Sequence, residues 1–191
     1  MKYYIGVDEV GRGPIAGPVT VCALVSFAGR NLELLKGVKD SKKLTPRGRE
    51  IWFKKIRETK VSGLTKFVVI SVDNKTIDKI GIVSALNLCV KKCLDKLDLP
   101  PEETSVLLDG SLHASKIYKS QETIIRGDEK EPLIAAASIV AKVSRDWHMS
   151  NLPERYKTYG FQNHKGYGTR AHYAAIKEYG ISDLHRRSFL K

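Results

Sequence analysis

The chain has no long apolar run, no Cys-x-x-Cys pair and no internal repeat. A membrane span needs about 18 consecutive apolar residues, so we expect no membrane association, and Met1-Lys2 leads directly into a strand-like segment instead of an apolar signal. Three cysteines among 191 residues, Cys22, Cys89 and Cys93, exclude a disulfide framework and argue against a zinc site. They indicate small apolar packing residues in a reducing compartment. We therefore expect a cytoplasmic protein.

Negative charge is also scarce, and the net charge of +12 calls for an anionic partner. Two segments concentrate the excess. Residues 36–60 hold ten Lys or Arg against three acids, and residues 161–191 hold six against two. Either segment alone is equally well explained as a solvated helix face. Two such segments in a chain that also carries spaced carboxylates favour a nucleic-acid backbone as the partner.

The hydrophobic pattern predicts an α/β fold with a mixed sheet flanked by helices. β-Branched and aromatic runs bounded by Gly or Pro predict strands, and three- and four-residue apolar spacing predicts helices. Thr45 with Pro46, and Gly180, are expected to begin and end helices. We expect one domain over residues 1–191, with a helical C-terminal extension from about residue 150. The expected strands are 2–8, 17–27, 64–73, 105–109 and 122–127, and the expected helices are 44–59, one or two within 77–97, 132–149 and 169–179.

Carboxylates stand at the ends of three of these strands. Asp8 ends the first strand and is followed by Glu9, Asp109 ends the strand over 105–109, and Asp128 follows the strand over 122–127. Each is also explained as a turn or cap residue when taken alone. If neighbouring strand ends bring them together, the carboxylates repel one another unless a divalent metal is bound. An oxygen-only donor set fits Mg²⁺ or Mn²⁺ better than zinc.

The turn Gly11-Arg12-Gly13 follows the first pair of acids directly. Adjacent strand residues point to opposite faces, so Asp8 and Glu9 reach one metal only if the strand ends or bends between them. Glycines also let backbone amides and carbonyls approach a sugar edge and bind the 2′-OH that separates RNA from DNA. The alternative is a plain hairpin turn that needs positive φ angles.

Seven blocks of the sequence, taken in order, resemble ribonuclease HII, the type 2 ribonuclease H family. The resemblance runs from the first strand to the C-terminus. One departure is Arg126 in the third acidic block, where the family commonly has lysine. The blocks are DEVGRG (8–13) with AGP (16–18), DSKKL (40–44), LLDG (107–110), RGD (126–128), AAASIVAKVSRD (135–146), HKGYGT (164–169) and HRRSF (185–189).

This resemblance implies a ribonuclease H-like sheet and an endonuclease that hydrolyses the RNA strand of RNA–DNA hybrids. It also implies cleavage 5′ of ribonucleotides embedded in duplex DNA, which gives 5′-phosphate and 3′-OH ends. Two Mn²⁺ or Mg²⁺ ions, roughly 4 Å apart in the substrate complex, activate water and stabilise the leaving oxygen. The implied catalytic metal ligands are Asp8, which we assign as the bridging ligand, Glu9, Asp109 and Asp128, and the implied substrate-binding residues are Gly11, Arg12, Gly13 and Tyr167.

Other residues have weaker assignments. Ser41 and Lys42 are expected to hold phosphate beside the scissile bond, with Lys43 as support, although the segment is also explained as the approach to a helix. Tyr167 is expected to stack on a sugar, or alternatively to cover the core. Asp146 is expected to form an ion pair on a helix. No role follows from the sequence for the remaining candidates, His164, His172 and His185.

Two other classes of protein remain open at this point. A related metal nuclease on the same fold, such as a junction resolvase or a type 3 ribonuclease H, shares the carboxylates. A non-catalytic hybrid-binding protein shares the basic surface without metal-dependent turnover. The expected partners are RNA–DNA hybrids and DNA duplexes that contain ribonucleotides, and the chain is expected to be a monomer.

Overall fold

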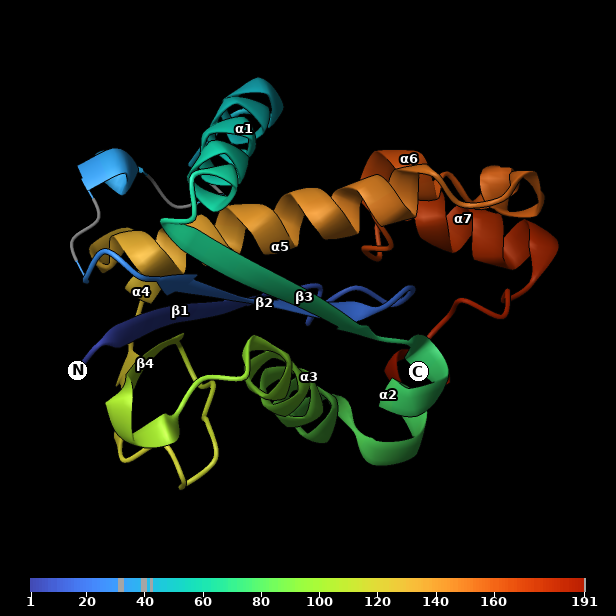
Figure 1. The fold of residues 1–191 in the computed structure, drawn as a ribbon. Helices are drawn as coiled ribbons and strands as arrows, with labels where there is room; N and C mark the ends of the chain where they lie inside the picture. Colours follow the sequence, from blue (N-terminus) through green and yellow to red (C-terminus); the bar gives the residue numbers. More distant parts are fainter. Residues whose placement is uncertain (31–32, 39–40, 42, 191) are drawn as a thin grey trace.

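Five strands form a single mixed sheet in the order β3-β2-β1-β4-β5 (Figure 1). β1 is antiparallel to β2 and parallel to β4, while β3 pairs antiparallel with β2 and β5 pairs parallel with β4. The mixed sheet predicted from the sequence is therefore confirmed. The strands are β1 (Tyr3–Val10), β2 (Val19–Ser26), β3 (Thr65–Val72), β4 (Thr104–Asp109) and β5 (Ser120–Ile124). The computed structural model describes residues 1–30, 33–38, 41 and 43–190.

Helices cover both faces of the sheet. Figure 1 shows α1 and α5 on one face and α2 and α3 on the other. Among the described residues, no helix is long and apolar enough to cross a membrane. The α-helices are α1 (Pro46–Val61), α2 (Asn74–Ile80), α3 (Ile82–Leu97), α4 (Gly127–Lys130), α5 (Pro132–Ser150), α6 (Phe161–His164) and α7 (Arg170–Tyr179), and the 3-10 helices are η1 (Glu33–Leu35), η2 (Pro101–Glu103), η3 (Glu154–Tyr159) and η4 (Arg187–Phe189).

The strand β2 lies between two apolar cores, and all eight of its residues are buried. Its alternating side chains divide between the faces: Val21 and Ala23 join the core under α3, and Cys22 and Leu24 join the core under α5. A strand buried on both faces has a continuous apolar sequence instead of an alternating one. The three cysteines pack in these cores as free thiols, and burial raises the pKa of both Cys89 and Cys93 to about 12.

The predicted helix boundaries are largely confirmed. Thr45 caps α1 by accepting a hydrogen bond from the Gly48 amide, at 3.1 Å, and Thr169 caps α7 in the same way. Gly81, at φ +79°, separates α2 from α3 within the predicted helical stretch. The apolar spacing over 77–97 predicts a buried helix stripe that includes Ile80, and this is wrong for Ile80, because its side chain is 38% exposed at the end of α2.

Two strand ends differ from the sequence prediction. β1 does not end at Asp8, because its pairing with β2 continues through Asp8↔Cys22 and Glu9↔Val21 to Val10. β5 ends at Ile124 instead of residue 127, because Arg126 adopts a left-handed conformation, at φ +56°, and begins α4. Both differences arise from backbone pairing and conformation, which the local apolar pattern does not specify.

α5 passes directly over the backbone of β1. A Cβ atom added to Gly6 meets the Leu133 carbonyl carbon at 2.2 Å and the Ile134 nitrogen at 2.6 Å. Only glycine permits this approach, since real Cβ atoms are not found so close to backbone atoms. The position of α5 over the sheet is therefore fixed at Gly6.

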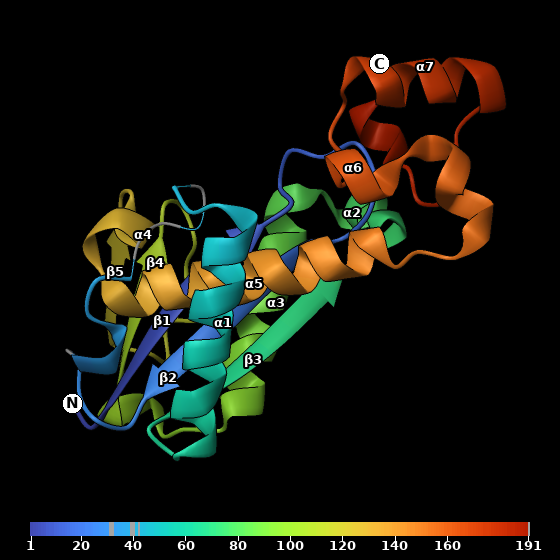
Figure 2. The ribbon, with the colours of Figure 1, turned by 90° about the horizontal axis from the view of Figure 1, so that it is seen from above.

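The C-terminal helical segment packs on the loop that joins β1 to β2. Figure 2 shows α6 and α7 at the far end of α5. The Ile15 amide donates to the Gly166 carbonyl at 2.9 Å, and the Arg186 amide donates to the Ile15 carbonyl at 2.8 Å. Ala16 and Met149 join a third apolar cluster with Phe161. These contacts bring the C-terminal segment of the chain beside the glycine turn.

We expect Gly6→Ala to lower the melting temperature, because its Cβ forces α5 away from β1. Overpacking of this kind costs about 1–3 kcal/mol or more, which corresponds to a fall of several degrees in a chain of this size. Thermal unfolding followed by circular dichroism measures the change. Gly48→Ala is the control, because its Cβ meets the Thr45 hydroxyl at 3.3 Å, so a shift of a few tenths of an ångström that keeps the cap bond is enough, and we expect a small change. Equal stability of Gly6→Ala and wild type contradicts this account of the packing.

Candidate active site

Three of the four predicted carboxylates meet where β1 and β4 diverge. Asp8, Glu9 and Asp109 each offer an oxygen within 4.8 Å of the others. The pairing of β1 with β4 ends at Val7↔Leu108, so the sheet is open on that side where the carboxylates lie. This is the carboxyl end of two neighbouring parallel strands, which is the usual place for a site in an α/β fold. The strand does not need to end between Asp8 and Glu9 to bring the two carboxylates together.

Local hydrogen bonds hold these carboxylates in place. The Glu9 amide donates to Asp8 Oδ1 at 2.7 Å, and the Gly127 amide donates to Asp109 Oδ1 at 2.6 Å. Burial, followed by the charge of Glu9, raises the pKa of Asp8 well above its usual value, and a hydrogen bond with Ser138 of α5 opposes this shift. The neighbouring negative charges of the cluster therefore favour the binding of a cation. Its donors are all carboxylate oxygens, which fits Mg²⁺ or Mn²⁺.

Asp128 lies beside this cluster and does not belong to the group of three. It is buried in the first turn of α4, next to Gly127, whose amide binds Asp109. Within the described part of the chain, the set of carboxylate oxygens that lie within 4.8 Å of one another comprises Asp8, Glu9 and Asp109. The role of Asp128 as the fourth ligand remains a prediction.

The glycine turn adjoins the cluster and faces Tyr167. Gly11 has φ +86°, and the Arg12 guanidinium donates to Ser111 Oγ at 2.9 Å, just beyond Asp109. A Cβ on Gly13 meets the Tyr167 ring at 4.0 Å. The Tyr167 side chain is 44% exposed, so it does not cover the core, and the ring stands against the turn where a substrate can reach both.

The segment before α1 is arranged differently from the expectation. The Ser41 side chain is buried, its hydroxyl is 2.8 Å from the Ser138 hydroxyl, and its carbonyl accepts a bond from Arg49. Lys43 forms an ion pair with Glu129 at 2.9 Å. Ser41 therefore connects this segment to the helix that carries Ser138, and its hydroxyl is not presented to solvent. The predicted phosphate ligand Lys42 lies outside the described residues.

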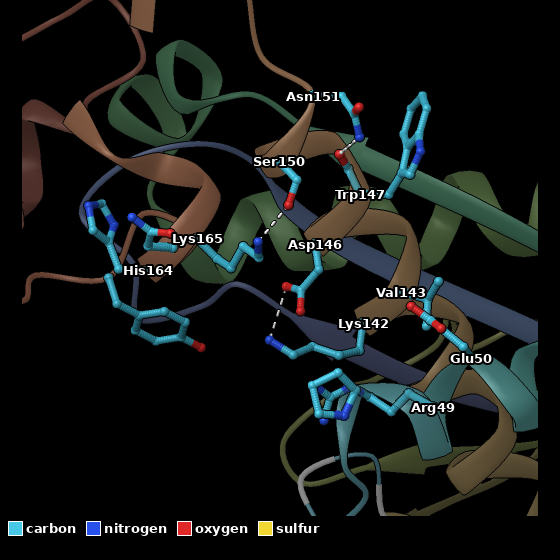
Figure 3. Close-up of a pocket in the computed structure, with 13 residues that line it drawn as sticks. Arg49, Glu50, Lys142, Val143, Asp146, Trp147, Ser150, Asn151, His164 and Lys165 are labelled. Atoms are coloured by element: carbon cyan, nitrogen blue, oxygen red, sulfur yellow. Dashed lines mark hydrogen bonds and ion pairs between the residues drawn. The ribbon is translucent and has the colours of Figure 1, made fainter. Parts of the chain in front are cut away.

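A cavity of about 660 Å³ opens between α1 and the C-terminal ends of α5 and α6 (Figure 3). Tyr167 lines this cavity, and so does Trp147, whose side chain is 68% exposed. The predicted ion pair of Asp146 is confirmed, since Lys142 Nζ lies 3.0 Å from Asp146 Oδ1 across this wall. Charged side chains from three elements line the cavity: Arg49, Glu50, Lys142, Asp146 and Lys165.

The three histidines left unassigned by the sequence gather behind Tyr167. The rings of His164 and His172 stack at 4.4 Å between centroids, and His172 Nε2 is 3.0 Å from His185 Nε2. His172 Nδ1 is 2.8 Å from the Tyr167 carbonyl. Burial lowers the pKa of His172 to about 4, so this ring is neutral near pH 7. The histidines therefore hold the backbone of the Tyr167 segment.

Three residues near the site lie in the sequence blocks named above, and the sequence predicts no role for them. Ser138 contacts Asp8, and the fully buried guanidinium groups of Arg145 and Arg186 bind the backbone around the glycine turn. Arginine is rarely buried, and the sequence gives no sign of the carbonyl acceptors that make its burial possible. The apolar stretch around Ser138 and Arg145 was the only available signal.

A known protein family and its curated members resemble this chain over nearly its whole length. The family model described as Ribonuclease HII matches residues 5–191. The chain belongs to the ribonuclease HII family. It is 44% identical over 190 residues to Ribonuclease HII of Caldicellulosiruptor saccharolyticus, covering 100% of this chain and 88% of the relative. It is 41% identical over 185 residues to Ribonuclease HII of Coxiella burnetii, covering 96% and 86%.

Solved structures agree with this assignment. The ribonuclease HII chain of a PCNA:RNase HII complex from Archaeoglobus fulgidus superimposes with a TM-score of 0.78 at 27% identity, over 96% of this chain and 93% of that one. Bst-RNase HIII in complex with Mn²⁺ superimposes with a TM-score of 0.74 at 21% identity, over 98% and 67%, and shows a shared fold. As a ribonuclease HII family member, the chain is a metal-dependent endoribonuclease that acts on RNA–DNA hybrids.

The raised pKa of Asp8 predicts a pH-dependent stability in chelator. A carboxyl whose pKa is higher in the folded chain than in the unfolded chain stabilises the fold at low pH, and this contribution is lost as pH rises from about 4 through the folded pKa. We expect the melting temperature of the metal-free wild type to fall over this range by a few degrees more than that of Asp8→Asn. Thermal scans in EDTA from pH 4 to pH 8 measure the difference.

Mn²⁺ should reverse this effect in the wild type and raise its melting temperature, because the ion binds the folded state. Asp8→Asn should respond weakly, and Asp95→Asn, whose side chain is exposed on α3, should behave as wild type. Identical pH profiles and identical Mn²⁺ responses for Asp8→Asn and wild type contradict the assignment of Asp8.

Proposed function

We propose that this chain cuts RNA–DNA hybrids and the 5′ side of ribonucleotides embedded in duplex DNA, leaving 5′-phosphate and 3′-OH ends. The observation that carries the proposal is the placement of the Asp8, Glu9 and Asp109 cluster beside a turn that faces the Tyr167 ring. Carboxylates that bind metal supply hydrolysis, whereas a backbone turn against an exposed ring supplies recognition of a sugar. One site with both parts fits a nuclease that selects ribose.

Asp8, Glu9 and Asp109 are proposed to hold Mn²⁺ or Mg²⁺ in the substrate complex, with Asp128 as the fourth ligand. Bound there, the metal would supply activation of the attacking water and stabilisation of charge on the leaving 3′-oxygen. The Glu9 and Gly127 amides fix Asp8 and Asp109 through hydrogen bonds. Such outer contacts orient metal ligands and strengthen their binding.

Tyr167 and the Gly11–Gly13 turn are proposed to bind the ribonucleotide from two sides. The ring of Tyr167 stacks on the sugar near the cut, and the turn contacts the 2′-OH with its backbone. The Tyr167 ring lies 4.0 Å from the position that a Cβ on Gly13 would take, which supports this arrangement. A site that positions a single ribose in this way fixes the register of the cut.

The cavity in Figure 3 is proposed to receive the duplex next to the cut. Tyr167 lines it, so the cavity is continuous with the ribose site. Arg49, Lys142 and Lys165 supply positive charge for phosphates, and exposed Trp147 offers an apolar face. Phosphate contacts of this kind position a nucleic acid without reading its sequence.

The decisive experiment compares Asp109→Asn with wild type on a DNA duplex that holds one ribonucleotide. We expect cleavage with Mn²⁺ or Mg²⁺ to fall by orders of magnitude, because the substitution removes a metal ligand. The fold should persist, because the side-chain amide introduced by the substitution keeps an oxygen that accepts the bond from the Gly127 amide. Binding in EDTA should remain near wild type and weaken linearly in log–log form with salt, as phosphate contacts require.

Asp95→Asn again provides the control, since Asp95 is exposed and pairs with Lys91. Undiminished cleavage by the wild type in excess chelator contradicts the metal-dependent mechanism. Binding without any metal-dependent turnover in the wild type identifies a hybrid-binding protein instead of a nuclease.

A second pair of variants tests the fourth ligand. Asp128→Asn should abolish most turnover at saturating metal, because Asp128 lies next to the residue that binds Asp109. Asp146→Asn should keep most turnover and change the melting temperature by at most a few degrees, since it loses one partly exposed ion pair with Lys142. Steady-state cleavage and thermal unfolding of both variants measure this. A kinetic defect that follows Asp146 and spares Asp128 contradicts the assignment.

A further inference from the structure

Two arginine side chains are fully buried around the glycine turn. Arg145 comes from α5 and Arg186 from the segment before η4, and both side chains have no exposed surface. Among the described residues, no carboxylate lies within ion-pair distance of either guanidinium group. Each instead donates three hydrogen bonds to backbone carbonyls. Buried cations are costly unless their donors are satisfied, so this arrangement fixes the carbonyls it binds.

Arg186 binds three carbonyls of the loop between β1 and β2. Its Nη2 donates to the Gly11 carbonyl at 2.7 Å, its Nη1 to the Arg12 carbonyl at 3.0 Å, and its Nε to the Gly17 carbonyl at 2.9 Å. In an extended strand, successive carbonyls point to opposite sides. Here two successive carbonyls point to one guanidinium group.

The planarity of the peptide bond then determines where the amides point. In a trans peptide, the N–H is directed opposite to the carbonyl of the same plane. The Gly11 carbonyl shares its plane with the Arg12 N–H, and the Arg12 carbonyl shares its plane with the Gly13 N–H. Both N–H groups are therefore directed away from Arg186, and neither donates to an acceptor in the part of the chain that the structure describes. Successive N–H groups in a turn form a concavity that binds an oxygen atom.

Arg145 holds the same loop from the other side and joins it to the Tyr167 segment. Its Nε donates to the Pro18 carbonyl at 2.9 Å, and its Nη1 donates to the Lys165 carbonyl at 3.0 Å. A Cβ on Gly11 meets Arg145 Nε at 2.2 Å. The turn thus packs against the Arg145 guanidinium group at Gly11, while the Arg186 guanidinium group orients the Gly11 and Arg12 carbonyls.

We infer that Arg186 is a positioning residue for ribose selection: it turns the Arg12 and Gly13 amides outward so that they donate to the 2′-oxygen of the ribonucleotide. This inference rests on the proposed function. It adds that the preference for RNA depends on a side chain that never touches the substrate. The short rigid fork of guanidinium suits three carbonyls at fixed positions, and a lysine ammonium cannot reproduce it.

The test uses two duplexes of the same sequence, one with a single ribonucleotide and one entirely of DNA. Affinities are measured in EDTA, so that no cleavage occurs, for wild type, Arg186→Lys and the exposed neighbour Arg187→Lys. We expect Arg186→Lys to lose about 3- to 10-fold of the preference for the ribonucleotide duplex, the scale of one or two net hydrogen bonds. Its affinity for the DNA duplex should stay near wild type, because phosphate contacts are unchanged. Arg187→Lys should keep the full preference.

A second measurement uses the wild type alone and does not depend on the variant folding. Amide hydrogen exchange by NMR should show rapid exchange at Arg12 and Gly13 in the free protein. The ribonucleotide duplex should protect both amides, and the DNA duplex should not. Protection by both duplexes identifies a phosphate as the ligand of the turn and overturns the inference.

Two further results overturn it. One is a folded Arg186→Lys that keeps the wild-type preference, and the other is an equal loss of affinity for both duplexes. Failure of the proposed function has a different signature, because the wild type then shows no preference for the ribonucleotide duplex and no metal-dependent cleavage.

Discussion

The close packing of α5 on the backbone of β1 is the constraint on which the site depends. Gly6 allows the helix to lie directly on the strand, and this contact sets Ser138 beside Asp8 two residues further along β1. α5 has 19 residues, about 28 Å at 1.5 Å per residue, so its far end extends to the loop after β1. Arg145 and Met149 there contact that loop and the C-terminal segment. One helix therefore relates the carboxylate cluster to the loop and the C-terminal segment that form the proposed ribose site.

The site is negatively charged, whereas the protein as a whole is positively charged. The chain carries a net charge of +12, yet among the described residues no Lys or Arg lies within ion-pair distance of Asp8 or Asp109. Backbone amides orient these two carboxylates instead, and amide dipoles offset only part of the repulsion within the cluster. The basic side chains stand further away, along the cavity of Figure 3. This separation leaves the cluster available to divalent cations and places basic side chains along the cavity that we propose to receive the duplex.

Most of the fold could be predicted from the sequence because its signals are local. Apolar runs and spacing identified the strands and long helices, and Thr45 identified a helix start through its side-chain cap. The end of β1 could not be predicted, since it depends on pairing with β2 and on the loss of pairing with β4. The end of β5 depends on the left-handed conformation of Arg126, which an arginine rarely adopts. The clustering of Asp8, Glu9 and Asp109 was predictable, because neighbouring strand ends bring their carboxylates together. The buried hydroxyl of Ser41 was not predictable, because its partner is Ser138, 97 residues away.

The buried guanidinium groups of Arg145 and Arg186 bind carbonyls, and every residue has a carbonyl, so no residue type marks their partners.

The backbone behind Tyr167 is also held by hydrogen bonds to a carbonyl. A carbonyl only accepts hydrogen bonds, so His172 donates from Nδ1 to the Tyr167 carbonyl. A neutral His172 then accepts at Nε2, and His185 donates to it from its own Nε2. The Ser182 amide donates to His185 Nδ1 at 2.8 Å, which completes this assignment of protons. His185 and Arg186 are adjacent in sequence: the first supports the Tyr167 backbone through His172, and the second orients the turn that faces the Tyr167 ring. Both sides of the proposed ribose site are therefore set by one dipeptide near the C-terminus, in a segment that carries an excess of positive charge.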